Sequence, residues 1–152
     1  MVKPERRSFI SVLAGLAAAP LLPARAARAE SDPFDELVRK VTGGAPVRPG
    51  RVVIDTPRLA DNGHSVPFKI SVESPMTAAD HVRSITLLSG RNPRPLMATF
   101  HLGPKSGRAV VATRVRLNGT QRVLAVARLS DGSCWSGSVE VEVTESACLD
   151  MS

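Results

Sequence analysis

The chain has 152 residues, the usual size of one domain, and its 43% hydrophobic and 22% charged residues exclude a disordered polar chain or a collagen-like repeat. Aromatic residues make up 3% and tyrosine is absent, which argues against single-stranded nucleic-acid binding, because that function needs exposed rings for base stacking. The formal net charge of +6 by itself suggests an anionic partner. Much of this charge, however, belongs to the N-terminal segment.

Residues 1–29 have the three parts of an export signal: a basic start, an apolar run from Phe9 to Leu22, and a small-residue ending at Ala27-Arg28-Ala29. The pair Arg6-Arg7 directly before the apolar run is typical of a twin-arginine signal, with an ordinary Sec signal as the alternative. The apolar run is too short for a comfortable bilayer span, so it predicts no membrane anchor. We therefore expect a periplasmic protein.

Cleavage after Ala29 changes the charge argument. It removes five of the 20 basic residues and one of the 14 acidic residues, which leaves 15 basic and 13 acidic residues in 30–152 and a formal charge of +2. A nucleic-acid protein needs clustered Lys and Arg to displace counterions from phosphates. The exported part has no such surplus, and its cysteines can oxidise in the periplasm.

Residues 30–49 are predicted to be a leader and a short amphipathic helix. Asp32 is a good N-cap, Pro33 suits the first helical position, and Gly43-Gly44 stops the helix. The apolar residues at helical spacing are Phe34, Leu37, Val38 and Val41. This helix is expected to pack either on the domain or on a partner.

From residue 50 to residue 144 the hydrophobic period changes to two. The clearest example is Ser65–Glu73, where apolar and polar residues alternate as in a strand with one buried face. Comparable runs are Arg51–Thr56, Val82–Leu88, Leu96–Leu102, Ala109–Leu117, Gln121–Leu129 and Ser138–Thr144. Turn residues separate these runs, so we predict an all-β, immunoglobulin-like antiparallel β-sandwich of about seven strands. Pro67 is expected to mark an edge strand, because it cannot donate a ladder hydrogen bond.

The sequence contains no enzyme signature. It has no Gly-x-Ser-x-Gly elbow, no His-Glu-x-x-His, no phosphate-binding glycine loop and no Cys-x-x-Cys. His64, His81 and His101 lack metal-ligand spacing, and His101 lies on the polar side of its strand. We therefore expect no catalytic residue, no metal site and no cofactor.

A copper-handling protein is a further possibility, because thioether, imidazole and thiolate ligands suit copper. Met76 and Met97 are the candidate thioethers. Neither His nor Met lies between Cys134 and Cys148, whereas a blue-copper loop clusters all three residue types, so copper ranks low.

The two cysteines differ in their predicted settings. Cys134 follows the Asp131-Gly132-Ser133 turn on the more polar side of its strand and is interpreted as a bystander thiol, with a small residue under the sheet edge as the favoured structural role. Cys148 lies beyond the last predicted strand, in the arm formed by residues 145–152, where few contacts would fix it. An unpaired thiol there is a liability unless it is used, so a carrier thiol, a Cys134–Cys148 disulfide and an interchain disulfide all stay open.

Several short motifs together resemble the SoxY family of periplasmic sulfur carriers. They are Asn62-Gly63-His64-Ser65-Val66-Pro67, Glu73-Ser74-Pro75-Met76, Asn92-Pro93-Arg94-Pro95, Thr113-Arg114-Val115-Arg116-Leu117, Val123-Leu124-Ala125-Val126-Ala127 and Ser130-Asp131-Gly132-Ser133. The resemblance implies an immunoglobulin-like sandwich, a heterodimer with a SoxZ-like subunit, and a non-enzymatic carrier whose arm cysteine, Cys148 here, covalently holds a sulfur intermediate for enzymes of thiosulfate-type sulfur oxidation.

The arm departs from the family pattern. The family's arm ends Gly-Gly-Cys-Gly-Gly, whereas this chain reads Ser146-Ala147-Cys148-Leu149-Asp150 and resembles a paralogous subgroup ending Ala-Ala-Cys-Ile-Glu. Ala147 and Leu149 make the arm stiffer than glycines would, and Glu145 and Asp150 place negative charge near the sulfur. These changes disfavour an anionic cargo such as thiosulfate, while the thiol-based carrier role is kept. The alternative is an assembly subunit with a bridged or unused arm cysteine.

Overall fold

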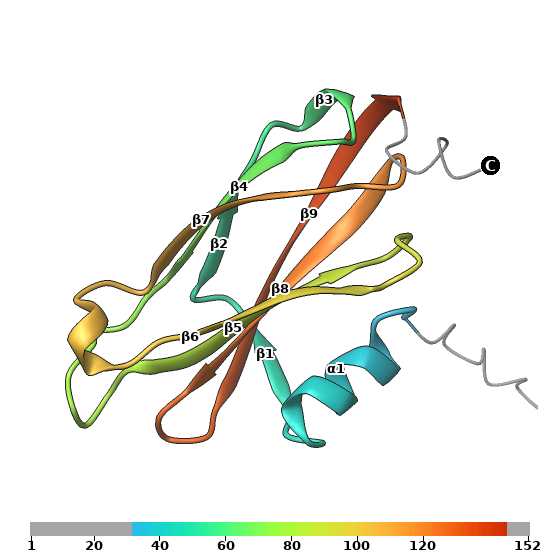
Figure 1. Ribbon diagram of the computed structural model, residues 1–152. Coiled ribbons are helices and arrows are strands. Elements are labelled where there is room, and N and C mark those ends of the chain that lie inside the picture. The colour runs from blue at the N-terminus through green and yellow to red at the C-terminus, as the bar shows by residue number, and fades with distance from the viewer. Residues whose placement is uncertain (1–31, 146–152) are drawn as a thin grey trace, which may run out of the picture. The chain divides into compact units, whose positions relative to one another are not determined.

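The computed structural model describes residues 32–145 and contains one helix, one 3-10 turn and nine strands in two layers (Figure 1). A six-stranded sheet has the order β1-β9-β8-β5-β6, with β3 (Leu59–Asn62) also paired to β9. Its other strands are β1 (Val47–Pro49), β5 (Val82–Ser89), β6 (Leu96–His101), β8 (Gln121–Leu129) and β9 (Cys134–Glu145). The second sheet has the order β2-β4-β7, with β2 (Val52–Asp55), β4 (Val66–Val72) and β7 (Val110–Val115). The immunoglobulin-like sandwich predicted from the sequence is confirmed.

The main core fills the space between the two sheets. Alternation along β4 buries Val66, Phe68, Ile70 and Val72, which are all at most 7% exposed. They face Ile85 and other buried side chains of the larger sheet, and the whole cluster is continuous. This packing supplies the main stabilisation of the fold, because each fully buried large apolar side chain contributes about 1.5–3 kcal/mol.

The larger sheet is covered on its outer face as well. Helix α1 (Asp35–Thr42) lies against that face, where Phe34 packs with Leu88 and Val126 in a second apolar cluster. This double cover explains why β5 and β8 contain apolar runs with little alternation. Of the two placements left open for the helix, the structure therefore has it packed on its own domain.

The start of α1 corrects the capping prediction. The N-cap position is Phe34, and Asp32 lies in the preceding turn, where its carboxylate accepts a hydrogen bond of 3.0 Å from the Phe34 N–H and pairs with Arg122. The Phe34 hydrogen bond, followed by the Arg122 contact, lowers the pKa of Asp32. The helix ends as predicted at Gly43, whose φ of 68° is the left-handed conformation that glycine tolerates best.

Two further corrections concern the strands. Strands β1 and β3 were not predicted, and both pair in parallel with β9, which begins at Cys134 rather than at Ser138 and runs to Glu145. Pro67 was expected on an edge strand but lies in β4, the central strand of its sheet. The pairing of β2 with β4 stops at Asp55 and Lys69, so Pro67 lies beyond the part of β4 that β2 covers.

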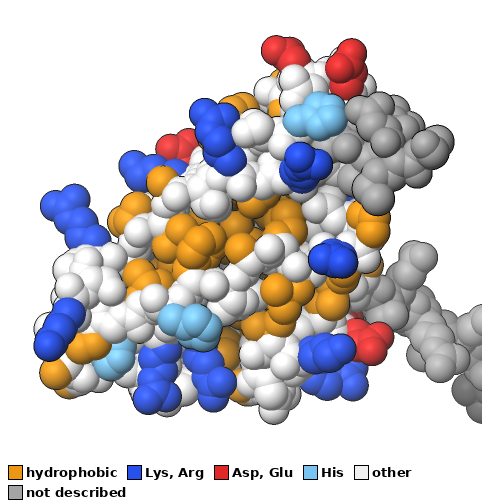
Figure 2. Space-filling model, in the orientation of Figure 1, with side chains coloured by type: hydrophobic (Ala, Val, Ile, Leu, Met, Phe, Trp, Pro, Cys, Tyr) orange, Lys and Arg blue, Asp and Glu red, His pale blue; other side chains and the backbone are white. Residues whose placement is uncertain are grey.

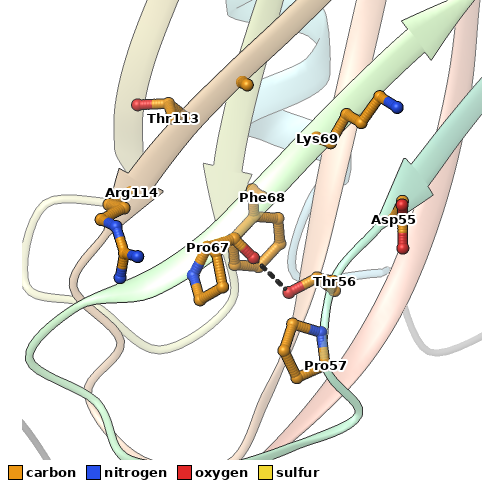
Figure 3. A pocket seen from close by; sticks show the side chains of 9 residues that line it. Asp55, Thr56, Pro57, Pro67, Phe68, Lys69, Thr113 and Arg114 are labelled. Atoms are coloured by element: carbon orange, nitrogen blue, oxygen red, sulfur yellow. Dashed lines mark hydrogen bonds between the residues drawn. The ribbon is translucent and has the colours of Figure 1, made fainter.

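Figure 3 shows the side chains that surround Pro67. A shallow pocket of about 660 Å³ lies where β2 leaves β4, and Pro57 and Pro67 face each other there. The Thr56 hydroxyl donates to the Pro67 carbonyl at 2.8 Å, which replaces strand pairing at this point.

Candidate functional site

Cys148, the predicted carrier residue, lies outside the described residues 32–145. The part of the candidate site that the structure describes is therefore the base of the arm, where β9 ends at Glu145. The second cysteine, Cys134, lies at the opposite end of the same strand. The length of β9 therefore limits how closely Cys134 and Cys148 can approach each other.

The end of β9 is held by two other segments. Asn62 of β3 is paired with Glu145, and the Gly63 N–H donates to the Glu145 carbonyl at 2.7 Å. The Gly63 carbonyl in turn accepts from the Leu117 N–H at 2.8 Å. Glu145 is exposed but its backbone is fixed, so the arm has a rigid base.

Asn92 ties a third loop to the same end of the sandwich. Its side-chain N–H donates to the Arg116 carbonyl at 2.8 Å, and its side-chain oxygen accepts from the Asn118 N–H at 2.8 Å and from the Gln121 side chain at 3.0 Å. Gln121 is buried and also accepts from the Arg91 N–H and the Ser89 hydroxyl. Three of the quoted family motifs thus meet at the base of the arm. They are the motifs that contain Asn62-Gly63, Asn92 and Arg116-Leu117. Sequence reasoning missed this network, although Asn before Gly or Pro was the available signal.

The surface around the base is polar and of mixed charge. Asp61, His64, Arg116 and Glu145 are exposed, and the Asn62 side chain accepts from the His64 N–H at 3.2 Å in a local turn. Among the residues in 32–145, no three His, Cys, Asp or Glu side chains are grouped so as to hold a metal ion.

Cys134 is buried, in agreement with its favoured interpretation as a small residue under the sheet edge. Its side chain is on the outer face, as the strand parity predicted, but α1 covers that face and leaves the residue 1% exposed. Its nearest described acceptor is the Gly132 carbonyl, 3.9 Å from Sγ. Burial raises the pKa of the Cys134 thiol, with smaller and opposing effects from Arg128 and Asp131. Because nucleophilic attack requires the thiolate, Cys134 is unsuited to carry a group.

Chain length separates the two thiols. β9 has 12 residues from Cys134 to Glu145, so at about 3.3 Å per residue its ends are roughly 36 Å apart. Cys148 follows Glu145 by three residues, which span at most about 11 Å in any conformation. The Cα atoms of Cys134 and Cys148 therefore stay at least about 25 Å apart, whereas a disulfide needs less than about 7 Å. An intrachain bridge would require β9 to unravel.

The described residues considered for copper are divided between the core and the surface. Met76 is buried in the main core, where its sulfur accepts from the Val82 N–H at 3.4 Å, and Met97 packs on the same core from β6. His64 lies at the arm end, whereas His81 and His101 line a pocket elsewhere on the larger sheet. Within residues 32–145, no helix is long and apolar enough to cross a bilayer.

Similar structures share the fold. The SoxY sulfur carrier protein from Chlorobium limicola f thiosulfatophilum superposes with a TM-score of 0.62 at 24% identity, covering 73% of this chain and 96% of that one. Superoxide reductase (neelaredoxin) from Ignicoccus hospitalis gives 0.56 at 19% identity, covering 62% and 80% of the two chains. Superoxide reductase from Nanoarchaeum equitans gives 0.53 at 13% identity, covering 63% and 100%. At these identities the likeness concerns the fold alone.

No curated protein matches the sequence. The sequence model of the family described as "Sulfur oxidation protein SoxY", in contrast, matches residues 38–148. That match spans the sandwich and ends on Cys148. The chain belongs to the SoxY family of sulfur oxidation proteins.

Proposed function

We propose that this chain is a periplasmic carrier that covalently holds a sulfur intermediate on Cys148 while partner enzymes act on it. The observation that carries the proposal is the length of β9, which keeps the two cysteines apart. Cys148 then has no partner for a bridge within its own chain, and the buried Cys134 cannot compete with it for cargo. The rigid base at Glu145 fixes the point from which the arm extends.

Loading of a thiosulfate-type cargo can be written as a balanced step. The Cys148 thiolate forms a bond to the sulfane sulfur of the anion, and the new S–S bond leaves two electrons to be removed. A redox enzyme acting as electron acceptor takes these two electrons. The thiolate is the reactive form, so the surroundings of the arm cysteine control the loading rate.

We also propose a SoxZ-like subunit as the partner in a heterodimer. The sandwich is open between the edge strands β6 and β7, where Phe100, Val111 and Val115 pack on the core but stay partly exposed. Figure 2 shows hydrophobic side chains gathered over this part of the face. A subunit that covers this strip would bury them, and the twin-arginine route would let an assembled pair be exported together.

The partner proposal is tested by co-purification. Ala98 is half-buried on β6 beside the open strip, so Ala98→Arg is expected to abolish co-purification with a co-expressed SoxZ-type subunit. Val53→Arg on β2 is the matched control, because Val53 is 59% exposed on the outside of the other sheet. Retained binding in Ala98→Arg, with near-UV circular dichroism showing a native fold, would contradict the proposed interface.

The carrier proposal is tested by intact-mass spectrometry of protein isolated from cells that oxidise sulfur compounds. Cys148→Ser is expected to remove every sulfur adduct, whereas Cys134→Ala is expected to keep them because its thiol is inaccessible. Adducts that persist on Cys148→Ser would show that the carrier residue is wrongly assigned. Adducts lost in both variants would show that Cys134 takes part.

A further inference from the structure

One row of paired residues crosses the outer face of the larger sheet. Ser84 on β5 is paired with His101 on β6 and with Arg128 on β8, and Arg128 is paired with Cys134 on β9. Paired residues in a sheet direct their side chains to the same face. A serine, a histidine, an arginine and a buried thiol therefore lie in line, on the face where α1 also packs.

A β-bulge adds a second arginine to this row. In the ladder between β5 and β8, Val82 is paired with Leu129 and Ser84 with Arg128, so Arg83 is the extra residue of β5. A bulge redirects the side chain at which it occurs. Here Arg83 lines the same pocket as Ser84 and Arg128.

His81 completes the lining and is held in position. Its backbone N–H donates to the Ser130 hydroxyl oxygen at 3.1 Å, and its Nδ1 lies 3.1 Å from the Thr77 carbonyl. The resulting pocket has a volume of about 440 Å³ and is lined by His81, Arg83, Ser84, His101, Leu102 and Arg128. In Figure 2, histidine and Lys or Arg side chains lie together toward the lower left of the face.

The charges in this pocket are of one sign. Its lining contains two guanidinium groups and two imidazoles but no carboxylate. Within residues 32–145 the ion pair found is Arg122–Asp32, so neither Arg83 nor Arg128 is neutralised by a described carboxylate within 4.0 Å. A concave surface that gathers cations without counter-charges concentrates the positive potential there.

A smaller cavity of about 260 Å³ continues from this pocket beneath the end of α1. It shares Ser84, His101 and Arg128 with the outer pocket and reaches Thr42 and Cys134. The Thr42 hydroxyl is buried and has no hydrogen-bond partner among the described residues, whereas Thr86 and Thr99 bond to each other at 3.2 Å. A buried hydroxyl without a protein partner needs one from the cavity, such as a water molecule that bridges to a bound ligand.

We propose that the outer pocket binds a small divalent inorganic oxyanion without covalent attachment. Arg83 and Arg128 offer forked N–H donors that match oxyanion geometry, and Ser84 and the His101 imidazole add further donors. The anion belongs beside the arginines rather than in the inner cavity, because the carbonyl end of a helix carries partial negative charge. This site is independent of the arm and does not require the proposed carrier chemistry.

The test uses sulfate as the probe and the complete chain carrying Cys148→Ser, so that covalent loading cannot contribute. Sulfate is titrated at constant ionic strength, balanced with sodium chloride, while amide NMR signals are recorded. We expect saturable shifts confined to residues 81–84, 101 and 128. Arg128→Gln is expected to weaken sulfate binding by about tenfold or more, because it removes charge-assisted hydrogen bonds.

Arg58→Gln is the matched control, since it removes the same charge beside Glu140 and Glu142, away from the pocket. Sulfate affinity should be unchanged in this variant. Shifts that do not saturate, or equal weakening in both variants, would overturn the site. Binding of an acidic hexaglutamate peptide at the same residues without sulfate binding would also overturn it, because the pocket would then be a protein-docking surface. Should Arg128→Gln lose its dispersed NMR spectrum, Arg83→Gln is measured instead, with the same expectation.

Discussion

The two cysteines differ in their relation to β9. Cys134 is the first residue of the strand, and Cys148 follows its last residue, Glu145, by three positions. At one end Cys134 is enclosed between the sheet and α1, and its burial raises the thiol pKa. At the other end the strand is held by β3 and the neighbouring loops up to Glu145. A rigid strand thus separates the buried Cys134 from Cys148, the proposed carrier thiol. A carrier in an oxidising compartment needs this separation, because a bridge between its two cysteines would block loading.

The largest expected effect concerns thiol reactivity. We expect a maleimide to label Cys148 rapidly in the folded protein, whereas Cys134 is labelled at least about a thousandfold more slowly, because its exposure requires opening of the sheet and α1. Peptide mapping after timed quenching measures both rates. In concentrated guanidinium chloride both cysteines should react alike, which serves as the control. Similar rates in the folded state would contradict the enclosed position of Cys134.

The second prediction concerns the stability of β9 where β2 crosses it. A Cβ atom added at Gly137 would lie 2.2 Å from the Val52 carbonyl oxygen, where β2 crosses β9. Backbone cannot move aside cheaply, so Gly137→Ala is expected to lower the free energy of unfolding by about 3 kcal/mol.

Gly103→Ala is the matched control for that variant, because an added Cβ at Gly103 would have no neighbour within 4 Å. Its effect should stay within about 0.5 kcal/mol in the same urea titration. Equal stability of the two alanine variants would mean that β2 and β9 do not cross as closely as described.

The smallest expected effect concerns the ion pair between Asp32 and Arg122. Asp32 pairs with Arg122, and these side chains are 41% and 42% exposed, so Asp32→Asn should cost only about 0.5 kcal/mol at pH 7. The pKa of Asp32 is lowered in the folded state, mainly by the Phe34 N–H and then by Arg122. This contribution is therefore present above the ordinary Asp pKa of 3.8 and is lost as the pH falls through the lower folded value.

Urea unfolding at pH 7, 5 and 3 measures this dependence. The difference between Asp32→Asn and the unmodified protein should shrink as the pH approaches 3. Glu36→Gln in the exposed first turn of α1 is the control, with no such ion pair. A difference that grows toward low pH would contradict the lowered pKa.

The sequence predicted the sandwich because alternation is strong in strands with one buried face, such as β4. It did not predict β1 and β3, since three or four residues show no usable period and both strands depend on the edge of β9. Cys134 was assigned to the correct face, but the sequence does not say which face α1 covers. Pro67 was misplaced because pairing can end within a central strand, and that depends on where β2 leaves the sheet.

The site was predictable to a different degree. The family motifs could be found in the sequence, but their meeting at the base of the arm depends on side-chain hydrogen bonds across distant loops, such as Asn92 to Arg116. The cationic pocket depends on a bulge at Arg83 that no residue pattern announces. In both cases the decisive information is the register between strands, which local periodicity does not contain.

Locating the sulfur adduct on the unmodified protein tests directly whether Cys148 is the carrier residue. Native-host protein is digested without reduction, and the peptides that contain Cys134 and Cys148 are compared by mass spectrometry. We expect sulfur-containing additions on the Cys148 peptide and an unmodified thiol in the Cys134 peptide. Additions on the Cys134 peptide, or the two peptides joined by a disulfide, would contradict it.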